Sequence, residues 1–403
     1  MGRWAQPVLA GVVTAVVGFA SSFAIVLAGL RAVGADPEQA TSGLLALCAA
    51  VGLTAIWAGL RYRMPISIAW STPGAALLVA TGGVPGGFGT AVGAFVGCGL
   101  LITVAGLFAP LGRWIAAIPG PLAAAMLAGV LLDLCLAPVR ALAEAPALAV
   151  PVVLTWAVLT RFARPWAVPA ALAVAVAAIV ATAPPGGPAG AALRPVIEPT
   201  VPGWSLQAAI GLALPLFLVT MASQNIPGMA VLAGYGYRPP LRPLLIGTGL
   251  ATTAAAPLGG HAVNLAAISA ALAAGPDAHP DPERRWIASV TAGTAMIALG
   301  LAAGPATALV LLSPPVLVEA VAGLALLGAL AGALTAAVAE PGRREAAVIT
   351  FAVTASGVTV LGVGAAFWGL LAGAAALLLR PRAPAAPAAD PGRDRAAAVP
   401  GGG

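Results

Sequence analysis

The sequence predicts an all-α polytopic membrane protein with 14 transmembrane spans, arranged as a 7+7 inverted repeat with broken third and tenth spans. Three observations predict this fold class. Hydrophobic residues make up 60% of the 403 residues and charged residues only 8%, a composition typical of integral membrane proteins. Arginines concentrate in alternate loops, and glycine, proline and polar positions recur in the two halves at one constant shift.

Apolar segments of the length that about 30 Å of hydrocarbon requires divide the chain into two sets. The first set lies near 8–32, 41–60, 65–81, 88–110, 114–137, 146–160 and 166–183. The second set lies near 205–234, 241–256, 261–274, 286–305, 312–339, 345–358 and 361–379. The predicted organisation is a first repeat (1–183), a Pro/Gly-rich connection (184–203), a second repeat (204–380) and a disordered C-terminal tail (381–403).

All nineteen basic residues are arginine, and they test the placement of the spans because basic residues gather in cytoplasmic loops. One side of the predicted topology holds Arg3, Arg61, Arg63, Arg113, Arg161, Arg164, Arg238, Arg242, Arg284, Arg285, Arg343, Arg344, Arg380 and Arg382. The other side holds only Arg31, Arg140 and Arg194. We therefore expect a multi-pass protein of the bacterial inner membrane with both termini in the cytoplasm. The arginines form no continuous basic face, so we expect the lipid bilayer and no nucleic acid as a partner.

An internal repeat supports the division into halves. Gly99, Gly106, Pro121 and Gly129 recur at one shift as Gly293, Gly300, Pro315 and Gly323. The same shift places Ser67 on His261 and Trp70 on Asn264. Because seven spans separate the copies, the second half enters the membrane in the opposite sense, which is the inverted repeat of secondary transporters.

The two stretches that this shift pairs, 64–78 and 256–272, each begin with strand-like or Gly-rich residues and continue as a short helix rich in small residues. Backbone that is not helical at membrane depth is tolerated only where protein buries it or where it lines a cavity. We therefore predict that each stretch is a short strand followed by a half-helix, and that the two half-helices form a substrate site.

Polar residues of the first broken span are candidate ligands. Ser67, Ser71 and Thr72 lie at the start of the half-helix, where free N–H groups and the positive end of the helix dipole attract an anion. The alternative is that these hydroxyls satisfy freed backbone groups or pack between helices. Trp70 has the shape to stack on an aromatic ring, or it is a packed core residue.

The second half supplies a different set of candidates. Gln224 and Asn225 interrupt the eighth span before Pro227 and are either substrate ligands or interhelical hydrogen-bonding groups. His261 is a ligand or a proton carrier, because imidazole titrates near neutral pH, or a neutral side chain satisfied by backbone carbonyls. Asn264 follows one turn later. Glu319 is a second proton-coupling candidate, unless it faces a neighbouring helix end.

The sequence contains no sign of an enzyme. It has no Gly-x-Ser-x-Gly, no His-Glu-x-x-His and only two histidines. Cys48, Cys98 and Cys135 are isolated in apolar segments, which predicts small core residues instead of metal ligands. We expect no catalytic residues, no cofactor and no metal.

Three segments carry a family resemblance: PISIAWSTPGAALL (65–78), MASQNIPGMAVL (221–232) and GGHAVNLAAISAAL (259–272). In this order and with these spacings, the chain from about residue 8 to 380 resembles the benzoate:proton symporter family (BenE type). The resemblance implies uptake of benzoate or a related aromatic carboxylate with a proton. A distant similarity to nucleobase and sulfate-type permeases implies a core domain, a gate domain and a substrate between the third and tenth spans.

Carried over to this sequence, the resemblance implies a binding site at Ser67, Trp70, Ser71, Thr72, His261 and Asn264, with Gln224 and Asn225 beside it. The proton-coupled nucleobase relatives use acids in the eighth and tenth spans, where this chain has amides and His261. The proton carrier therefore stays unassigned between His261 and Glu319. A passive or exchanging permease for another organic anion or a nucleobase is the alternative function, and a homodimer is a possible assembly.

Overall fold

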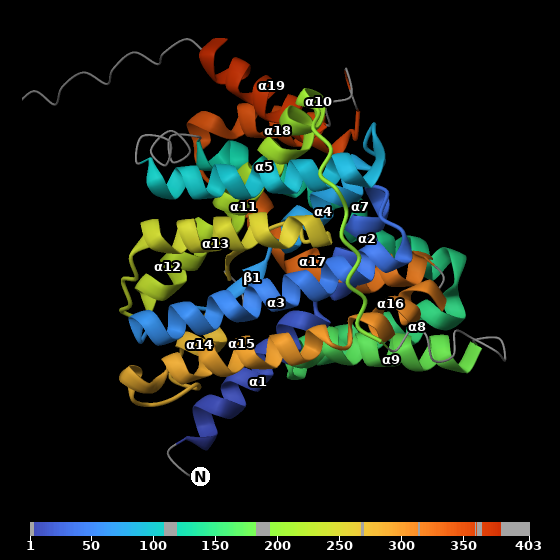
Figure 1. Cartoon of the computed structure of the whole chain (residues 1–403). Helices are drawn as coiled ribbons and strands as arrows, with labels where there is room; N and C mark the ends of the chain where they lie inside the picture. The colour runs from blue at the N-terminus through green and yellow to red at the C-terminus, as the bar shows by residue number, and fades with distance from the viewer. Residues whose placement is uncertain are drawn as a thin grey trace, which may run out of the picture.

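The computed structural model describes residues 4–108, 119–182, 194–266, 270–312, 315–358, 360 and 365–379. The tail 381–403 and part of the connection (184–193) lie outside the described residues. Most of the described chain forms helices that run alongside one another (Figure 1). Six helical segments there are long and apolar enough to cross a membrane. They are Ala5–Ala32, Pro37–Tyr62, Gly87–Leu107, Gly120–Glu144, Leu206–Gly234 and Val316–Ala337.

The first predicted span is broken in the structure, although the sequence predicted one continuous helix. The predicted span 8–32 is divided into α1 (Ala5–Ala20) and α2 (Phe23–Ala32). The Ser21 and Ser22 hydroxyls both donate to the Gly18 carbonyl, at 3.1 and 2.8 Å. Such side-chain bonds compete with the regular helix ladder, and the helix is interrupted at these serines.

The next helix, α3 (Pro37–Tyr62), has a clear start. The Asp36 carboxylate accepts the Gln39 N–H at 2.8 Å, and the Gln39 side chain accepts the Asp36 N–H at 3.0 Å. This is a capping box, which satisfies backbone donors that the first helical turn leaves free. The rest of the first half comprises β1 (Ile68–Trp70), α4 (Thr72–Thr81), α5 (Gly87–Leu107), α7 (Gly120–Glu144), α8 (Pro146–Phe162), η1 (Arg164–Trp166) and α9 (Ala167–Thr182).

The second half follows a similar order. Its eighth span contains α10 (Leu206–Ala208), η3 (Ala209–Ala213), α11 (Leu214–Thr220), η4 (Met221–Asn225) and α12 (Ile226–Gly234). It continues with α13 (Leu241–Ala255), η5 (Ala256–Leu258), β2 (Val263–Leu265), α14 (Ala270–Ala274), η6 (Pro282–Arg284) and α15 (Trp286–Gly300). The last elements are α16 (Ala303–Leu312), α17 (Pro315–Ala337), η7 (Pro341–Arg343), α18 (Arg344–Ala355) and α19 (Ala365–Leu379). The separate helix α16 was not expected, since its residues were divided between the predicted span 286–305 and the stretch after it.

The strands predicted in the third and tenth spans are both present. β1 and β2 pair antiparallel, with Ile68 opposite Leu265, Ala69 opposite Asn264 and Trp70 opposite Val263. Two further backbone bonds extend the ladder: Ser71 N–H donates to the Ala262 carbonyl and Ala266 N–H to the Ser67 carbonyl, both at 2.9 Å. The pairing satisfies backbone groups in the middle of the helical layer, where water is scarce. Each strand thus ends beside the start of the other.

Glycines allow the long helices to approach closely. α3 packs on α15, and a Cβ at Gly52 would lie 2.5 Å from the Gly293 carbonyl oxygen. α5 packs on α13, and a Cβ at Gly99 would lie 2.9 Å from the Gly249 carbonyl oxygen. In the predicted internal repeat, α3 of the first half corresponds to α13 of the second, and α5 corresponds to α15. The α3–α15 contact and the α5–α13 contact are therefore equivalent under the repeat. This packing agrees with the predicted repeat, whose full 14-span form stays a prediction.

The α5–α13 contact gives a stability prediction. We expect Gly99→Ala to lower the melting temperature of the detergent-solubilised protein, because the new methyl group would meet the Thr253 backbone nitrogen at 2.7 Å. Overpacking of this kind costs about 1–3 kcal/mol. Gly97→Ala is the matched control on the same helix, since its Cβ would make only an ordinary 3.4 Å contact with Ala213. Equal melting temperatures for the two variants would contradict the close approach.

Contacts between loops join segments that are far apart in the sequence at each end of the helices. The Arg63 guanidinium lies 4.4 Å from the centre of the Trp286 ring, and the Gln6 side chain donates to the Asp277 carbonyl at 3.1 Å. At the opposite end, the Glu198 N–H donates to the Ser42 hydroxyl at 3.0 Å. The described part of the connection, residues 194–205, runs across the helices from near α9 to α10 (Figure 1). Tyr237 also donates to the Pro282 carbonyl at 2.8 Å, so Arg63, Arg238, Arg284 and Arg285 are at the same end of the molecule, which we call the arginine-rich face.

Candidate functional site

A cavity of about 1190 Å³ lies between two groups of helices. One wall is formed by α1, α3, β1, η4 and α15, and the other by α7, α8, α9 and α17. The lining residues of α8 are near its end and those of α9 are at its start, whereas those of α3 (Val51 and Ala55) and α15 (Ser289, Ala292, Gly293 and Met296) reach the middle of each helix. Apart from Gly293 and Met296, these positions are on the half of each helix toward the arginine-rich face. The cavity reaches from the strand pair to exposed residues there, Arg164 and Glu340.

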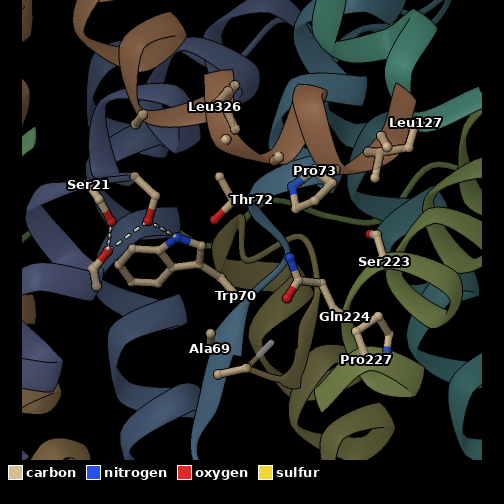
Figure 2. A pocket seen from close by; sticks show the side chains of 18 of the residues that line it. Ser21, Ala69, Trp70, Thr72, Pro73, Leu127, Ser223, Gln224, Pro227 and Leu326 are labelled. Atoms are coloured by element: carbon tan, nitrogen blue, oxygen red, sulfur yellow. Dashed lines mark hydrogen bonds between the residues drawn. The ribbon is translucent and has the colours of Figure 1, made fainter. Parts of the chain in front are cut away.

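Trp70 forms one side of the inner end of this cavity (Figure 2). Its side chain is 2% exposed, and its indole N–H donates to the Ser22 hydroxyl at 2.9 Å. Ser22 donates in turn to the Gly18 carbonyl, and Phe19 meets the indole edge to face with a centroid distance of 6.0 Å. The interruption between α1 and α2 therefore fixes the orientation of the indole ring.

Thr72 and Ser67 also line the cavity, at the two ends of β1. Thr72 is the first residue of α4, and the Ser71 hydroxyl caps that helix by accepting the Gly74 N–H at 3.1 Å. The Ser67 hydroxyl is buried without a hydrogen-bond partner among the described residues. The start of α4 and a free hydroxyl thus face the same space, which favours a ligand that carries hydrogen-bond acceptors.

The adjacent amides Gln224 and Asn225 have different surroundings. Gln224 lines the cavity and lies across it from Trp70 (Figure 2). Asn225 is fully buried, and its side-chain oxygen accepts the Leu265 N–H of β2 at 2.9 Å. Both residues belong to the π-helical turn η4, which holds an extra residue and is often found at functional sites. Only one of the two amides is therefore placed to meet a ligand.

His261 and Asn264 lie behind the strands and do not line the cavity. Both side chains have no exposed surface. The His261 Nε2–H donates to the Ser71 carbonyl at 3.0 Å, and Nδ1 has no partner in the described part of the chain. With the Asn264 amide oriented to satisfy both of its ends, its oxygen accepts the Ser71 N–H at 2.9 Å. Together with Asn225 and Ser71, these residues hold β1, β2 and the start of α4 in place.

Glu319 is also outside the cavity wall. It lies near the start of α17, partly buried, in the field of Asp133, Arg140 and Glu144 on α7. Asp133 and Arg140 form an ion pair with each other. Glu319 is therefore part of a charged group near the end of α7, whereas the cavity is lined by the first turns of that helix.

Comparison with known proteins identifies the family of this chain. Residues 4–379 match the model of the family described as benzoate membrane transport protein, BenE. The chain belongs to the BenE family. It is 38% identical over 367 residues to the inner membrane protein YdcO of Escherichia coli, covering 91% of this chain and 93% of that protein. It is 33% identical over 389 residues to the benzoate membrane transport protein of Acinetobacter baylyi, covering 93% of this chain and 95% of that protein.

A solved structure supports the same fold. The transmembrane domain of the cyanobacterial bicarbonate transporter BicA superposes with a TM-score of 0.59 at 17% identity, covering 93% of this chain and 98% of that domain. The BenE family is a family of membrane transporters, so this BenE protein is a multi-pass membrane transporter and not an enzyme. The resemblance that the three sequence segments indicated is thereby confirmed.

The structure of this BenE protein adds lining residues that the sequence analysis did not select. Ser289 on α15 lines the cavity, and its buried hydroxyl has no partner among the described residues. Ser21, Ser22 and Ser223 line it too. Nothing in the sequence distinguishes Ser289 from an ordinary small residue of a span, because its role depends on how α15 is rotated. Cys48, Cys98 and Cys135 are buried, as predicted for small core residues.

Proposed function

We propose that this protein imports benzoate or a related aromatic carboxylate together with protons, across the bacterial inner membrane, by alternating access. One observation carries the proposal: the cavity places a fixed indole ring, Trp70, beside the start of a half-helix and the amide of Gln224. An aromatic ring and a carboxylate are the two groups that these surfaces match. The name of the Acinetobacter baylyi relative, benzoate membrane transport protein, supports the same substrate class.

The ligand would lie with its ring against Trp70 and the apolar wall from α7 and α17. Its carboxylate would face Thr72, the first turn of α4 and the Gln224 amide. The inner end of the cavity has no charged side chain among the described residues, since the charged lining residues are Arg164 and Glu340 at the open end. Neutral donors and a helix terminus can hold an anion without the strong pairing that would slow its release.

The buried polar residues would position this site instead of contacting the ligand. The Ser71 carbonyl accepts from His261, the Ser71 hydroxyl accepts from Thr220 at 3.0 Å, and the Leu265 N–H donates to Asn225. Each bond fixes one end of a strand or the start of α4. Of the two proton-coupling candidates, His261 is the one that contacts the site, through the residue next to Thr72. We therefore propose His261 as the proton carrier and Glu319 as a structural acid.

The cavity opens at the arginine-rich face, which the positive-inside rule assigns to the cytoplasm. On that assignment the described conformation is inward-facing. The wall formed by α1, α3, β1 and α15 would be the core, and the wall formed by α7, α8, α9 and α17 the gate. Movement of one wall against the other would open the inner end to the opposite side, as in other transporters built from inverted repeats.

Uptake into proteoliposomes tests the proposal. We expect the purified protein to accumulate radiolabelled benzoate, and an inward proton gradient to accelerate that uptake. Unlabelled ring-substituted benzoates should compete, and uracil and sulfate should not. Uptake of benzoate without any response to the gradient would favour the alternative, a passive or exchanging permease. Absence of benzoate uptake, with transport of uracil or another anion, would contradict the proposed substrate.

The two adjacent amides give a paired test of the site. We expect Gln224→Leu to weaken benzoate binding roughly 10- to 100-fold, because a hydrogen bond to a charged group contributes about 1.5–3 kcal/mol. Its melting temperature should change little. Asn225→Leu should lower the melting temperature, since it leaves the buried Leu265 N–H without its acceptor. Binding by calorimetry and thermal unfolding separate the two effects, and weaker binding with a normal melting temperature for Asn225→Leu would reverse our placement.

A further inference from the structure

The open end of the cavity contains an arginine that the proposed central site does not use. Among the described lining residues only Arg164 and Glu340 carry charge. Glu340 is paired with Arg343, at 2.8 Å between Oε2 and Nη1, and these side chains are 51% and 44% exposed. Arg164 has no ion pair and no side-chain hydrogen bond within the described residues. The cavity entrance therefore has one uncompensated positive charge.

The local structure places Arg164 on the cavity wall and its neighbour Arg161 outside it. α8 ends at Phe162, and Ala163 has φ −149° and ψ 58°, which interrupts the helix before η1. Arg161 stays on the last turn of α8, where its guanidinium lies 5.7 Å from the centre of the Phe162 ring, and it does not line the cavity. Although Arg161 and Arg164 are only three positions apart, Arg164 lines the cavity and Arg161 does not.

Two further residues of α8 line the same wall. Trp156 and Thr160 are four residues apart, so they lie on one face of the helix, one turn above the other. The wall therefore presents an aromatic ring, a hydroxyl and a guanidinium in order toward the arginine-rich face. These groups match an aromatic carboxylate, since a guanidinium can bind a carboxylate through two parallel hydrogen bonds and an indole can pack on a ring.

We propose that Trp156, Thr160 and Arg164 form a second binding subsite, at the open end of the cavity, for an aromatic carboxylate passing between the central site and the arginine-rich face. This inference rests on the proposed function, because it takes its ligand from it. An ion pair that is partly exposed to water is weak. The subsite therefore holds the anion briefly and raises its concentration at the cavity entrance, without competing with the central site for occupancy.

The inference is tested with the full-length protein in sealed vesicles, with transport of radiolabelled benzoate measured from each face. We expect Arg164→Gln to raise the half-saturating concentration measured from the arginine-rich face about three- to fivefold at low salt, the scale of a partly exposed ion pair. The value measured from the opposite face should stay unchanged. High salt should bring wild type and Arg164→Gln together, because it screens exposed charges.

Arg161→Gln is the matched control, and it should behave as wild type at both faces. Arg164→Lys should recover only part of the effect, because lysine keeps the charge without the bidentate geometry. Trp156→Leu should raise the same half-saturating concentration for benzoate and leave that for a non-aromatic carboxylate such as acetate unchanged. These two variants keep the test decisive if Arg164→Gln does not fold.

Two outcomes would overturn the inference. Arg164→Gln and Arg161→Gln would have the same half-saturating concentrations, or Arg164→Gln would change the values at both faces equally and at every salt concentration. Either result with normal benzoate transport by the wild type removes the subsite and leaves the proposed function standing. Absence of benzoate transport by the wild type would instead remove the proposed function, and with it the ligand of this subsite.

Discussion

Trp70→Leu is expected to lower the affinity for benzoate roughly tenfold or more, because it removes the ring face on which the aromatic substrate is proposed to lie. The loss should be selective. Wild type should prefer benzoate to cyclohexanecarboxylate, which has the same carboxylate on a non-aromatic ring, and Trp70→Leu should bind the two acids about equally. Competition against radiolabelled benzoate in proteoliposomes measures both affinities.

Two further variants make this test specific. Trp70→Phe keeps a ring but loses the indole N–H that donates to Ser22, so its affinity should lie between those of wild type and Trp70→Leu. Trp204→Leu removes a tryptophan that is 71% exposed and should leave transport unchanged. If Trp70→Leu kept the preference for benzoate over cyclohexanecarboxylate, the ring would have to bind elsewhere in the cavity.

His261→Gln is expected to abolish the acceleration of benzoate uptake by an inward proton gradient, while benzoate binding persists. Glutamine retains an N–H group to donate to the Ser71 carbonyl, as His261 does at 3.0 Å, but it cannot gain or lose a proton near neutral pH. The start of α4 should therefore stay in place while the titratable group is lost. Uptake with and without the gradient, together with equilibrium binding, distinguishes coupling from binding.

Glu319→Gln is the matched control for His261→Gln. It removes the charge of the other proton-coupling candidate, which does not line the cavity. We expect its uptake to respond to the gradient as that of wild type does. The opposite pattern, coupling lost in Glu319→Gln and kept in His261→Gln, would make Glu319 the carrier and restrict His261 to holding β1 and α4.

The strands at the centre of the fold were predictable because their signal is local. Gly259 and Gly260 before His261, and Pro73 after Thr72, are poor residues for a continuous membrane helix. Their position within apolar segments left few structures that satisfy the backbone. The break at Ser21–Ser22 and the separate helix α16 were not predicted, because the serines and alanines at these places are also common in continuous spans.

The candidate site was predictable as a region, but not residue by residue. Gln224 and Asn225 are adjacent amides with nearly identical chemistry, and the π-helical turn η4 leaves one in the cavity and the other bonded to β2. A sequence period of 3.6 residues does not record where such a turn occurs. His261 was grouped with the cavity residues because the pairing of β1 with β2, which leaves it behind the strands, joins segments far apart in the sequence.

The sequence by itself determined the membrane class, the two broken spans, the pattern of arginines and the membership of the BenE family. Hydrophobicity and turn-forming residues are properties of short segments. They decide whether a segment spans the membrane or is interrupted, whichever helices it packs against. Only the tertiary structure decided which polar groups share a cavity, because that depends on the rotation and contact of helices far apart in the chain. Ser289 on α15 and Arg164 after α8 became visible as lining residues for that reason.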